Sequence, residues 1–232
     1  LMTTRRGGFS AAPFDSMNLR DGLGDDPKAV QCNQRLLAEA IGATPVYLNQ
    51  VHGATVARLV AADAAPDAAL QEADASVTTE RGIACAVQVA DCLPVLLAAP
   101  GGVGAAHAGW RGLAGGVIEA TVRALCEAAA CEPARLHAWL GACIGPGHFE
   151  VGPDVLQAFG AAPETPGDRF RAKAAGKWLA DLPSLARDRL LACGVAQVSG
   201  GHWCTVADAS RFFSFRRDKL TGRMAALVWR RG

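Results

Sequence analysis

The sequence predicts one α+β domain with mixed sheets, covering residues 1–232. Strand patterns and helix patterns are interspersed along the chain without a regular βαβ repeat. No low-complexity or linker-like segment divides the chain, and the alanine-rich stretch 61–69 is too short to do so. A chain of 232 residues is long enough to bury a sizeable core. One compact unit is therefore the expected organisation.

The N-terminal third predicts a helix followed by a strand pair. Asp26 and Pro27 precede KAVQCNQRLLAEAIG, which is typical of a capped helix that ends at Gly42. VYLNQV and TVARLV are β-rich runs separated by a turn sequence that begins at His52. We therefore expect His52 at a strand end or in a loop.

The central and C-terminal parts predict further strands and helices in alternation. DASVTT, IACAVQV, LPVLLAA and VGAAHA indicate successive strands, and the middle two are apolar enough to be buried on both faces. The period changes at Gly112, where a helix is expected. ARLHAWLGACIG and VAQVSG indicate strands, and PDVLQAF and LPSLARDRLLACG indicate helices. RFFSFRRDKLTGRMAALVW predicts a closing hairpin with its turn at 219–222.

Composition favours a small-molecule partner over nucleic acid or membrane. The 23 basic and 22 acidic side chains create no strong field for either polyanion. No apolar run approaches the roughly 20 residues that span a bilayer, and the first residues lack a secretory signal. The eight cysteines stand singly, so we expect reduced thiols and a cytoplasmic protein. A monomer or weak homodimer is expected.

Three short stretches each place a possible metal ligand among small or turn-forming residues. They are NQVHG with His52, VADCLPV with Cys92 and AAHAGWRG with His107. Catalytic zinc is commonly held by three ligands from distant elements, and two imidazoles and a thiolate suit Zn²⁺ with a fourth position open for water or substrate. The alternative is two ordinary histidines and a buried apolar cysteine.

The same stretches and several others resemble a known family. TTRRGGFS, APFDSMNL, NQVHG, ADCLPVLL, AAHAGWRGL, GACIGPGHFEVG, CT at 204–205 and FFSFRRDKLTGR resemble the YfiH-type family, also called the laccase-domain or multicopper polyphenol oxidase family. The resemblance runs from Thr3 to about Trp229. It implies a four-layer α/β/β/α fold and a zinc site at His52, Cys92 and His107.

The resemblance also implies purine nucleoside chemistry. The family is associated with phosphorolysis of adenosine, inosine or guanosine, with methylthioadenosine cleavage and with adenosine deamination. Zinc suits deamination because it lowers the pKa of bound water to about 7. Asp91 is the expected proton carrier, with a turn-capping role as the alternative. Phosphorolysis needs a cation for phosphate, and Arg5 and Arg111 are the candidates.

Other residues received weaker assignments. Asn18 and Gln50 match family positions and are candidates for binding the base or sugar, while Asn18 could instead fix a turn. Small residues around His107 are expected to leave a mouth for a flat substrate, lined or braced by Trp110 and Arg111. Six further aromatic side chains are interpreted as structural: His137, His148, His202, Phe212, Phe213 and Phe215.

Three rival functions stay open at this point. The first is an amidase in peptidoglycan precursor editing, with Cys92 as nucleophile, His107 as base and Asp91 as orienting group. The second is a polyphenol oxidase with copper, although five histidines cannot supply both sites of a multicopper laccase. The third is a non-catalytic module with structural zinc, which predicts a closed fourth position.

Overall fold

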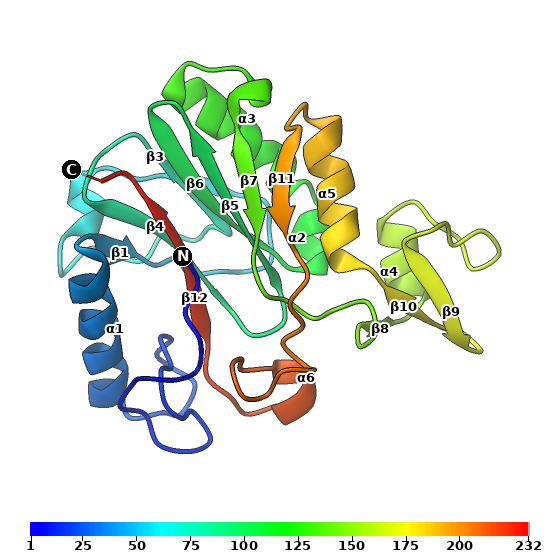
Figure 1. Cartoon of the computed structure of the whole chain (residues 1–232), viewed down its shortest axis with the longest axis horizontal. Coiled ribbons are helices and arrows are strands. Elements are labelled where there is room, and N and C mark those ends of the chain that lie inside the picture. The colour runs from blue at the N-terminus through cyan, green and yellow to red at the C-terminus, as the bar shows by residue number, and fades with distance from the viewer. Residues whose placement is uncertain (232) are drawn as a thin grey trace.

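The computed structural model, which describes residues 1–231, confirms the predicted mixed α/β class with four layers (Figure 1). The larger sheet has six strands in the order β11-β7-β5-β6-β3-β2. Neighbours are antiparallel except at its two edges, where β11 runs parallel to β7 and β2 parallel to β3. The strands are β2 (Val56–Arg58), β3 (Ala75–Thr78), β5 (Leu93–Ala99), β6 (Gly102–Ala108), β7 (His137–Leu140) and β11 (Gln197–Gly200).

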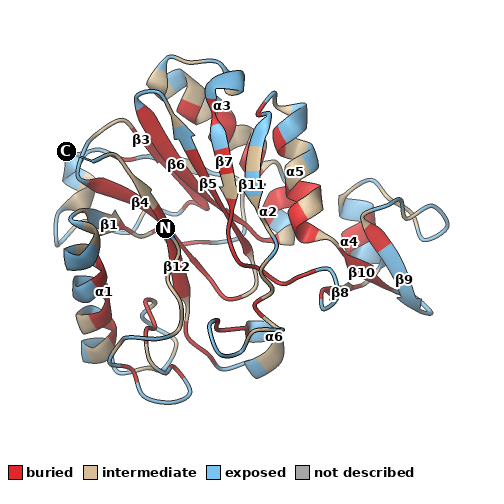
Figure 2. Ribbon diagram, in the orientation of Figure 1, coloured by how far each residue is buried: buried red, intermediate tan, exposed pale blue. Residues whose placement is uncertain are grey.

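A second sheet and the first helix form the layers on one side. This sheet has the order β1-β4-β12, from β1 (Thr44–Val46), β4 (Ile83–Val89) and β12 (Met224–Trp229). Helix α1 (Pro27–Ile41) begins after the Asp26 carboxylate, which accepts a hydrogen bond from the Lys28 amide, and ends at Gly42 with φ of 63°. These ends agree with the prediction. Every residue of β4 is buried because α1 and the larger sheet cover its two faces (Figure 2).

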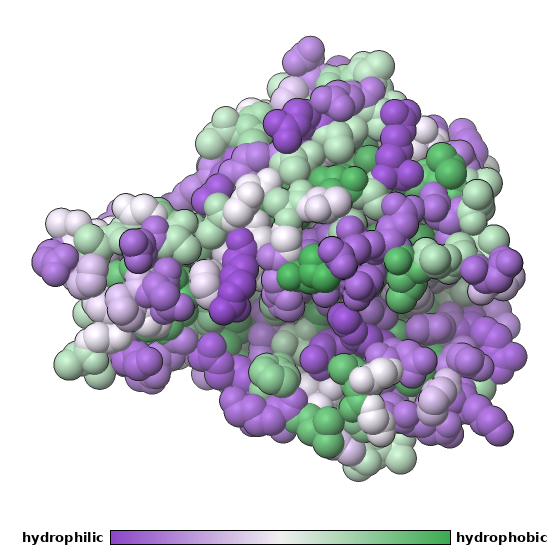
Figure 3. Space-filling view, turned by 180° about the vertical axis from the view of Figure 1, so that it is seen from behind, coloured by the Kyte–Doolittle hydropathy of each residue, from purple (hydrophilic) through white to green (hydrophobic). Residues whose placement is uncertain are grey.

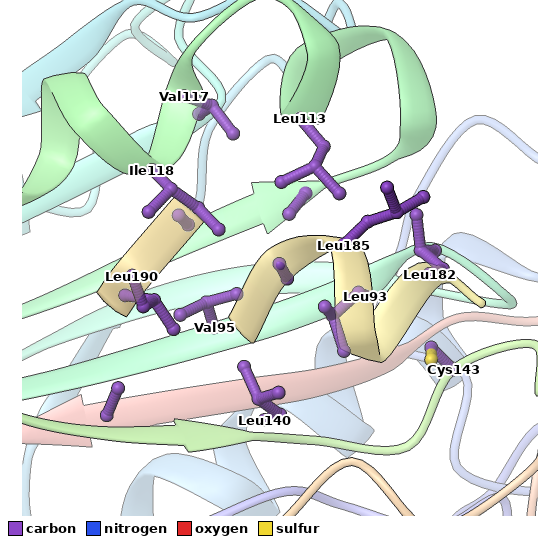
Figure 4. Close-up of a cluster of buried hydrophobic side chains, with 14 of the residues drawn as sticks. Leu93, Val95, Leu113, Val117, Ile118, Leu140, Cys143, Leu182, Leu185 and Leu190 are labelled. Atoms are coloured by element: carbon purple, nitrogen blue, oxygen red, sulfur yellow. The ribbon is translucent and has the colours of Figure 1, made fainter. Parts of the chain in front are cut away.

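Helices α3 (Val117–Ala129) and α5 (Leu182–Ala192) cover the outer face of the six-stranded sheet. Figure 4 shows Ile118 and Leu190 from these helices packing towards Val95 of the sheet. These side chains are buried, and full burial of each contributes about 1.5–3 kcal/mol relative to exposure. The cluster fixes β5 and β6, whose ends position the candidate site.

A small third sheet stands at the side of the molecule (Figure 1). It has the order β8-β10-β9, from β8 (Glu150–Val151), β9 (Phe170–Ala174) and β10 (Lys177–Ala180), and α4 (Pro153–Ala158) accompanies it. The sequence analysis did not predict β9 and β10. Four of the five residues of β9 are exposed, so the strand lacks the alternating apolar pattern that marks a half-buried strand.

The predicted C-terminal hairpin is wrong. Residues 215–218 form the short helix α6 (Phe215–Asp218), and the side chain of Ser214 caps it by accepting a hydrogen bond from the Arg217 amide. The following strand β12 pairs with β4 of the second sheet instead of folding back on its own segment. The capping of α6 by Ser214 and the long-range pairing of β12 with β4 therefore determine the structure of this region. Neither can be recognised from the alternation of apolar and polar residues alone.

The remaining short elements are η1 (Ala61–Ala64), α2 (Trp110–Ala114) and η2 (Pro133–Arg135). In the part of the chain that the structure describes, no helix has the length and apolarity needed to cross a bilayer. All eight cysteines are free thiols, as predicted. From behind, hydrophilic residues occupy much of the surface and hydrophobic ones form small separate groups (Figure 3).

Candidate metal centre

The structure brings His52, Cys92 and His107 together. One possible ligand atom from each lies within 4.8 Å of those of the other two. The Cys92 Sγ is 3.9 Å from the His52 Nε2, and the two imidazole centroids are 4.9 Å apart in an edge-to-face arrangement. Across residues 1–231, this is the one group of three or more potential ligands at such spacing. The sequence therefore predicted the residues that converge.

Strand pairing explains how Cys92 reaches His107. Strands β5 and β6 are antiparallel neighbours, with Leu93 opposite Ala108 and Pro94 opposite His107. Cys92 immediately precedes β5, so the pairing places it at the end of β6 where His107 lies. His107 is buried, Cys92 is half-buried and His52 is exposed. The group thus runs from the interior to the surface.

Asp74, which the sequence analysis missed, organises this group. Its fully buried carboxylate accepts hydrogen bonds from the amides of Val51 (3.1 Å), His52 (2.9 Å) and Gly53 (2.6 Å). It also pairs with His107 Nδ1 at 2.8 Å. Because Nδ1 is engaged, Nε2 is the ring nitrogen left to bind a metal, as in carboxylate–histidine–zinc triads. Asp74 therefore holds one ligand directly and a second through its loop.

The backbone at His52 is strained, which shows what Asp74 must stabilise. His52 has φ of 63°, in the left-handed region that costs a residue other than glycine of order 1–3 kcal/mol. The amides of His52 and its two neighbours all donate to the Asp74 carboxylate. Hydrogen bonds to a charged acceptor contribute about 1.5–3 kcal/mol each, so together they exceed the strain.

Electrostatics favour a thiolate at Cys92. Burial raises the pKa of the thiol, but the charge and hydrogen bonding of His107 and contact with His52 outweigh it and bring the pKa to about 6. Burial lowers the pKa of His107, but Cys92 and Asp74 outweigh it and raise the pKa to about 9. Burial likewise raises the pKa of Asp74, while the His107 and backbone hydrogen bonds lower it further than burial raises it. The thiolate is the form that binds metals.

The donor set fits a zinc ion. Zinc–sulfur bonds of about 2.3 Å and zinc–nitrogen bonds of about 2.0–2.1 Å in a tetrahedron place sulfur and nitrogen about 3.6 Å apart. The observed separation of 3.9 Å between Cys92 Sγ and His52 Nε2 is close to this value. Two imidazoles and one thiolate also suit copper, so the donor set alone does not select one metal.

Residue 109 is a glycine because a side chain there would contact Cys92 and His52. A Cβ added at Gly109 would lie 3.0 Å from Cys92 Sγ and 3.1 Å from His52 Cδ2. By contrast, Ala105, Ala106 and Ala108 are buried in β6 and pack in the cores on its two faces. The residues around His107 are therefore small for two reasons. The alanines allow close packing between the layers, and Gly109 leaves space for Cys92 and His52.

A cleft of about 260 Å³ opens beside Cys92 and His52. The walls combine aromatic and apolar side chains with two arginines. They comprise His52, Ala90, Asp91, Cys92, Gly109, Trp110, Arg111, Ile144, Phe149, Leu182, Phe215 and Arg216. Larger hollows elsewhere on the surface have none of the three ligands in their walls. The cleft therefore provides an open side at which a substrate can approach the ligands.

Asp91 lines the cleft, and its carboxylate is engaged by the protein. Oδ1 accepts a hydrogen bond from the Thr205 hydroxyl at 2.5 Å, and Oδ2 accepts one from the Arg216 amide at 2.6 Å. The residue has φ of 107°, a strained conformation for aspartate. These contacts fit the turn-fixing alternative, in which Asp91 positions Cys92. Its role as proton carrier stays a prediction.

Of the predicted substrate-binding residues, Arg111 reaches the cleft and three others do not line it. The Arg111 guanidinium lies 4.3 Å from the centroid of the Trp110 ring. Arg5 donates to the Asp15 and Ala209 carbonyls and pairs with the Asp15 carboxylate. Gln50 and Asn18 are buried, and both make their side-chain hydrogen bonds to protein atoms. Their assignment to substrate stays a prediction.

The three C-terminal phenylalanines divide into two groups. Phe212 and Phe213 are buried, as predicted, with 6% and 0% of their surface exposed. Phe215 is 52% exposed and forms part of the cleft wall. Because Phe215 begins α6, its side chain escapes the strand alternation that was assumed for it.

Comparison with known proteins places the whole chain in one family. The model of the family described as multi-copper polyphenol oxidoreductase laccase matches residues 1–231. The chain belongs to this laccase-like YfiH family. It is 48% identical over 231 residues to a purine nucleoside phosphorylase of Pseudomonas aeruginosa, covering 98% of this chain and 91% of that one. It is 45% identical, with the same coverage, to the purine nucleoside phosphorylase YfiH of Escherichia coli.

Solved structures agree with the four-layer fold of the YfiH family. A crystal structure of a Neisseria meningitidis protein superimposes with a TM-score of 0.91 at 44% identity, covering 100% of this chain and 93% of that one. YlmD from Geobacillus stearothermophilus gives a TM-score of 0.91 at 34% identity, covering 100% and 91%. The resemblance seen in the sequence motifs is therefore confirmed for family and fold.

Proposed function

We propose that this chain is a zinc-dependent purine nucleoside phosphorylase. The observation that carries the proposal is the convergence of His52, Cys92 and His107 beside a cleft with aromatic walls, which His52 and Cys92 line. Names of relatives at 42–48% identity support the reaction class. Adenosine, inosine, guanosine and methylthioadenosine are the proposed substrates, and adenosine deamination is a proposed second activity.

Phosphorolysis exchanges one bond at the ribose for another. An oxygen of phosphate forms a bond to C1′ while the bond from C1′ to the purine nitrogen breaks. The electron pair of that bond stays on the purine, which takes up a proton. Charge therefore develops on the departing base, and an enzyme accelerates the reaction by stabilising that charge and orienting both reactants.

Residues of this chain can supply orientation and charge. His52, Cys92 and His107 would hold the ion, and zinc supplies Lewis-acid chemistry when bound. Trp110, with the neighbouring aromatic walls of the cleft, offers flat apolar surfaces for a purine. Arg111 brings a positive charge to the same opening. Asp74 keeps the His107 ring in one orientation and tautomer.

The test uses zinc-loaded protein with a nucleoside panel, with and without phosphate, followed by chromatography. Free base and ribose 1-phosphate are expected only with phosphate, and inosine from adenosine reports deamination. Cys92→Ala should lose stoichiometric zinc and turnover, whereas Cys32→Ala, on α1 outside the cleft, should keep both. If neither free base nor deaminated nucleoside forms at high enzyme concentration, the proposal is contradicted.

A thiol amidase is the second candidate, and one observation favours it. Cys92, His107 and Asp74 form the order of groups found in cysteine hydrolases, in which a carboxylate orients the histidine beside the thiolate. The orienting carboxylate is Asp74, whereas the sequence analysis assigned Asp91 to that position. Metal content distinguishes the candidates, because a thiolate nucleophile would work in zinc-free protein and the phosphorylase would not.

A further inference from the structure

Two arginines that no ligand assignment includes, Arg20 and Arg223, have backbone amides bonded to the same side chain, and Arg223 lies near a wall of the cleft. Arg223 directly precedes β12, and the pairing of Met224 with Val89 sets it beside Ala90, which lines the cleft. Its guanidinium is 5.9 Å from the centroid of the Phe215 ring, another wall of the cleft. Arg20 is the cation that acts most strongly on Arg223.

Asn18 fixes the two arginines relative to each other. Its Oδ1 accepts hydrogen bonds from the backbone amides of both Arg20 (3.2 Å) and Arg223 (2.9 Å). Its Nδ2 donates to the Arg20 carbonyl and to the Asp25 carboxylate. Asn18 is fully buried, and the Leu19 amide adds a hydrogen bond to the Arg223 carbonyl. The pair is therefore built into the fold rather than left on a loose surface loop.

No carboxylate neutralises the pair. Neither Arg20 nor Arg223 takes part in an ion pair within 4.0 Å among residues 1–231. The Arg223 Nη1 donates to the Thr221 and Gly222 carbonyls, which leaves its other nitrogens without a protein acceptor in that range. Asp25 is occupied by the Asn18 amide and the Asp26 backbone.

The surroundings of Arg223 support an anion beside it. Burial, followed by the charge of Arg20, lowers the pKa of Arg223, while Cys92 and Asp91 act in the opposite direction. Two half-buried arginines whose backbones are held together by Asn18, with no ion-pair partner, are electrostatically unfavourable, and a bound oxyanion reduces that cost. Guanidinium groups present paired N–H donors that match phosphate oxygens.

We infer that Arg20 and Arg223 form the subsite for the phosphate co-substrate, and this rests on the proposed phosphorolysis. Of the two sequence-based candidates, Arg111 stacks on Trp110 in the cleft wall, and each guanidinium nitrogen of Arg5 already donates to Asp15 or to the Ala209 carbonyl. Arg223 lies opposite Ala90, two residues before Cys92, and near the Phe215 ring in the cleft wall, so phosphate held there would be close to a nucleoside in the cleft. Asn18 is then a positioning residue for phosphate rather than a direct contact to base or sugar.

The test measures phosphate binding separately from turnover. Inorganic phosphate is titrated calorimetrically, in buffer without nucleoside, into four zinc-loaded proteins: wild type, Arg20→Gln, Arg223→Gln and Arg223→Lys. The KM for phosphate and the KM for inosine are measured in parallel. Arg123→Gln, an exposed arginine on α3 without a side-chain hydrogen bond in the described residues, is the matched control. Thermal unfolding verifies that each variant is folded.

Loss of one charged hydrogen-bond donor group is expected to weaken phosphate binding about ten- to hundredfold, with the KM for inosine changed less than about threefold. Arg223→Lys should recover part of the loss, and Arg123→Gln should match wild type. Unchanged phosphate affinity in both folded Gln variants overturns the subsite, even if phosphorolysis is observed. Arginine-dependent phosphate binding without turnover of any nucleoside keeps the anion site and refutes the proposed function.

A parallel titration with inosine monophosphate distinguishes a free phosphate from one attached to the nucleoside. The co-substrate assignment expects inorganic phosphate to bind at least as tightly as the monophosphate to the Arg20–Arg223 pair. Tighter, arginine-dependent binding of the monophosphate would overturn that assignment.

Discussion

Replacing Asp74 by asparagine should weaken both the fold and the metal centre. The carboxylate accepts four N–H groups, two on each oxygen, at 2.6–3.1 Å. Asparagine keeps one acceptor oxygen and turns the other into an NH₂ donor, so two N–H groups lose their acceptor. At about 1.5–3 kcal/mol for each charged hydrogen bond, the loss is about 3–6 kcal/mol. Because Val51 and His52 are exposed and water can compensate, we expect about 3 kcal/mol.

Two measurements check the Asp74→Asn prediction. A loss of about 3 kcal/mol lowers the Tm of a domain of this size by about 6–12 °C in calorimetry. Zinc affinity, measured by competition with a chelating dye, should fall about ten- to hundredfold because His107 loses its orienting partner. Asp188→Asn is the control, since Asp188 forms an exposed ion pair with Arg169 that contributes at most about 1 kcal/mol. A Tm and zinc affinity equal to the control would refute this account of Asp74.

Three further predictions test the site. Gly109→Ala should weaken zinc binding at least about tenfold because its Cβ approaches Cys92 Sγ to 3.0 Å, whereas Gly147→Ala, with open space around it, should not. In chelator-treated protein, the reaction of Cys92 with iodoacetamide should reach half of its maximal rate near pH 6, because the lowered pKa makes the thiolate available at lower pH. Mass mapping of the labelled peptide measures this reaction, and a midpoint near pH 9 would contradict the prediction. Trp110→Ala should raise KM for inosine more than kcat falls if the ring stacks the purine, and equal losses in both would argue against stacking.

The sequence predicted the three candidate ligands because each stands in a local pattern that can be recognised without knowledge of the fold. His52 follows a strand-like run in a turn sequence, and His107 ends a run of small residues. Their convergence depends on the β5–β6 pairing, which sets Cys92 at the end of β6. That pairing is long-range information, so the resemblance to the family supplied what spacing could not.

Asp74 escaped prediction for a physical reason. It lies in QEADASVTT, where it is one of two acidic residues at the start of a predicted strand and resembles an ordinary surface residue. Its importance comes from the fold, which turns the amides of residues 51–53 and the His107 ring towards one buried carboxylate. A usable signal existed, since the acid is flanked by small residues that continue into the fully buried strand β3.

The positions of Arg5, Arg20 and Arg223 also could not be predicted from the local sequence. The family motifs directed attention to Arg5, whose guanidinium is engaged by Asp15 and by carbonyls of distant segments. Arg20 and Arg223 are separated by most of the chain, and they meet because Asn18 accepts an amide from each. Arg223 ends the family motif FFSFRRDKLTGR, but the motif alone gives it no ligand, and the local sequence of Arg20 does not distinguish it from a solvated surface arginine.

Both acidic residues nearest the ligands carry out structural work that bears on catalysis. Asp74 and Asp91 each hold a ligand-bearing loop whose backbone is strained, with φ of 63° at His52 and 107° at Asp91. The Asp74 carboxylate accepts four protein N–H groups, and the Asp91 carboxylate accepts one hydrogen bond on each oxygen. Asp74 is a poor proton carrier, because taking up a proton would break the hydrogen bonds that orient His107 and the backbone at His52. In the proposed phosphorolysis, the proton for the departing purine would therefore come from the cleft side, from solvent or from Asp91, which lines the cleft.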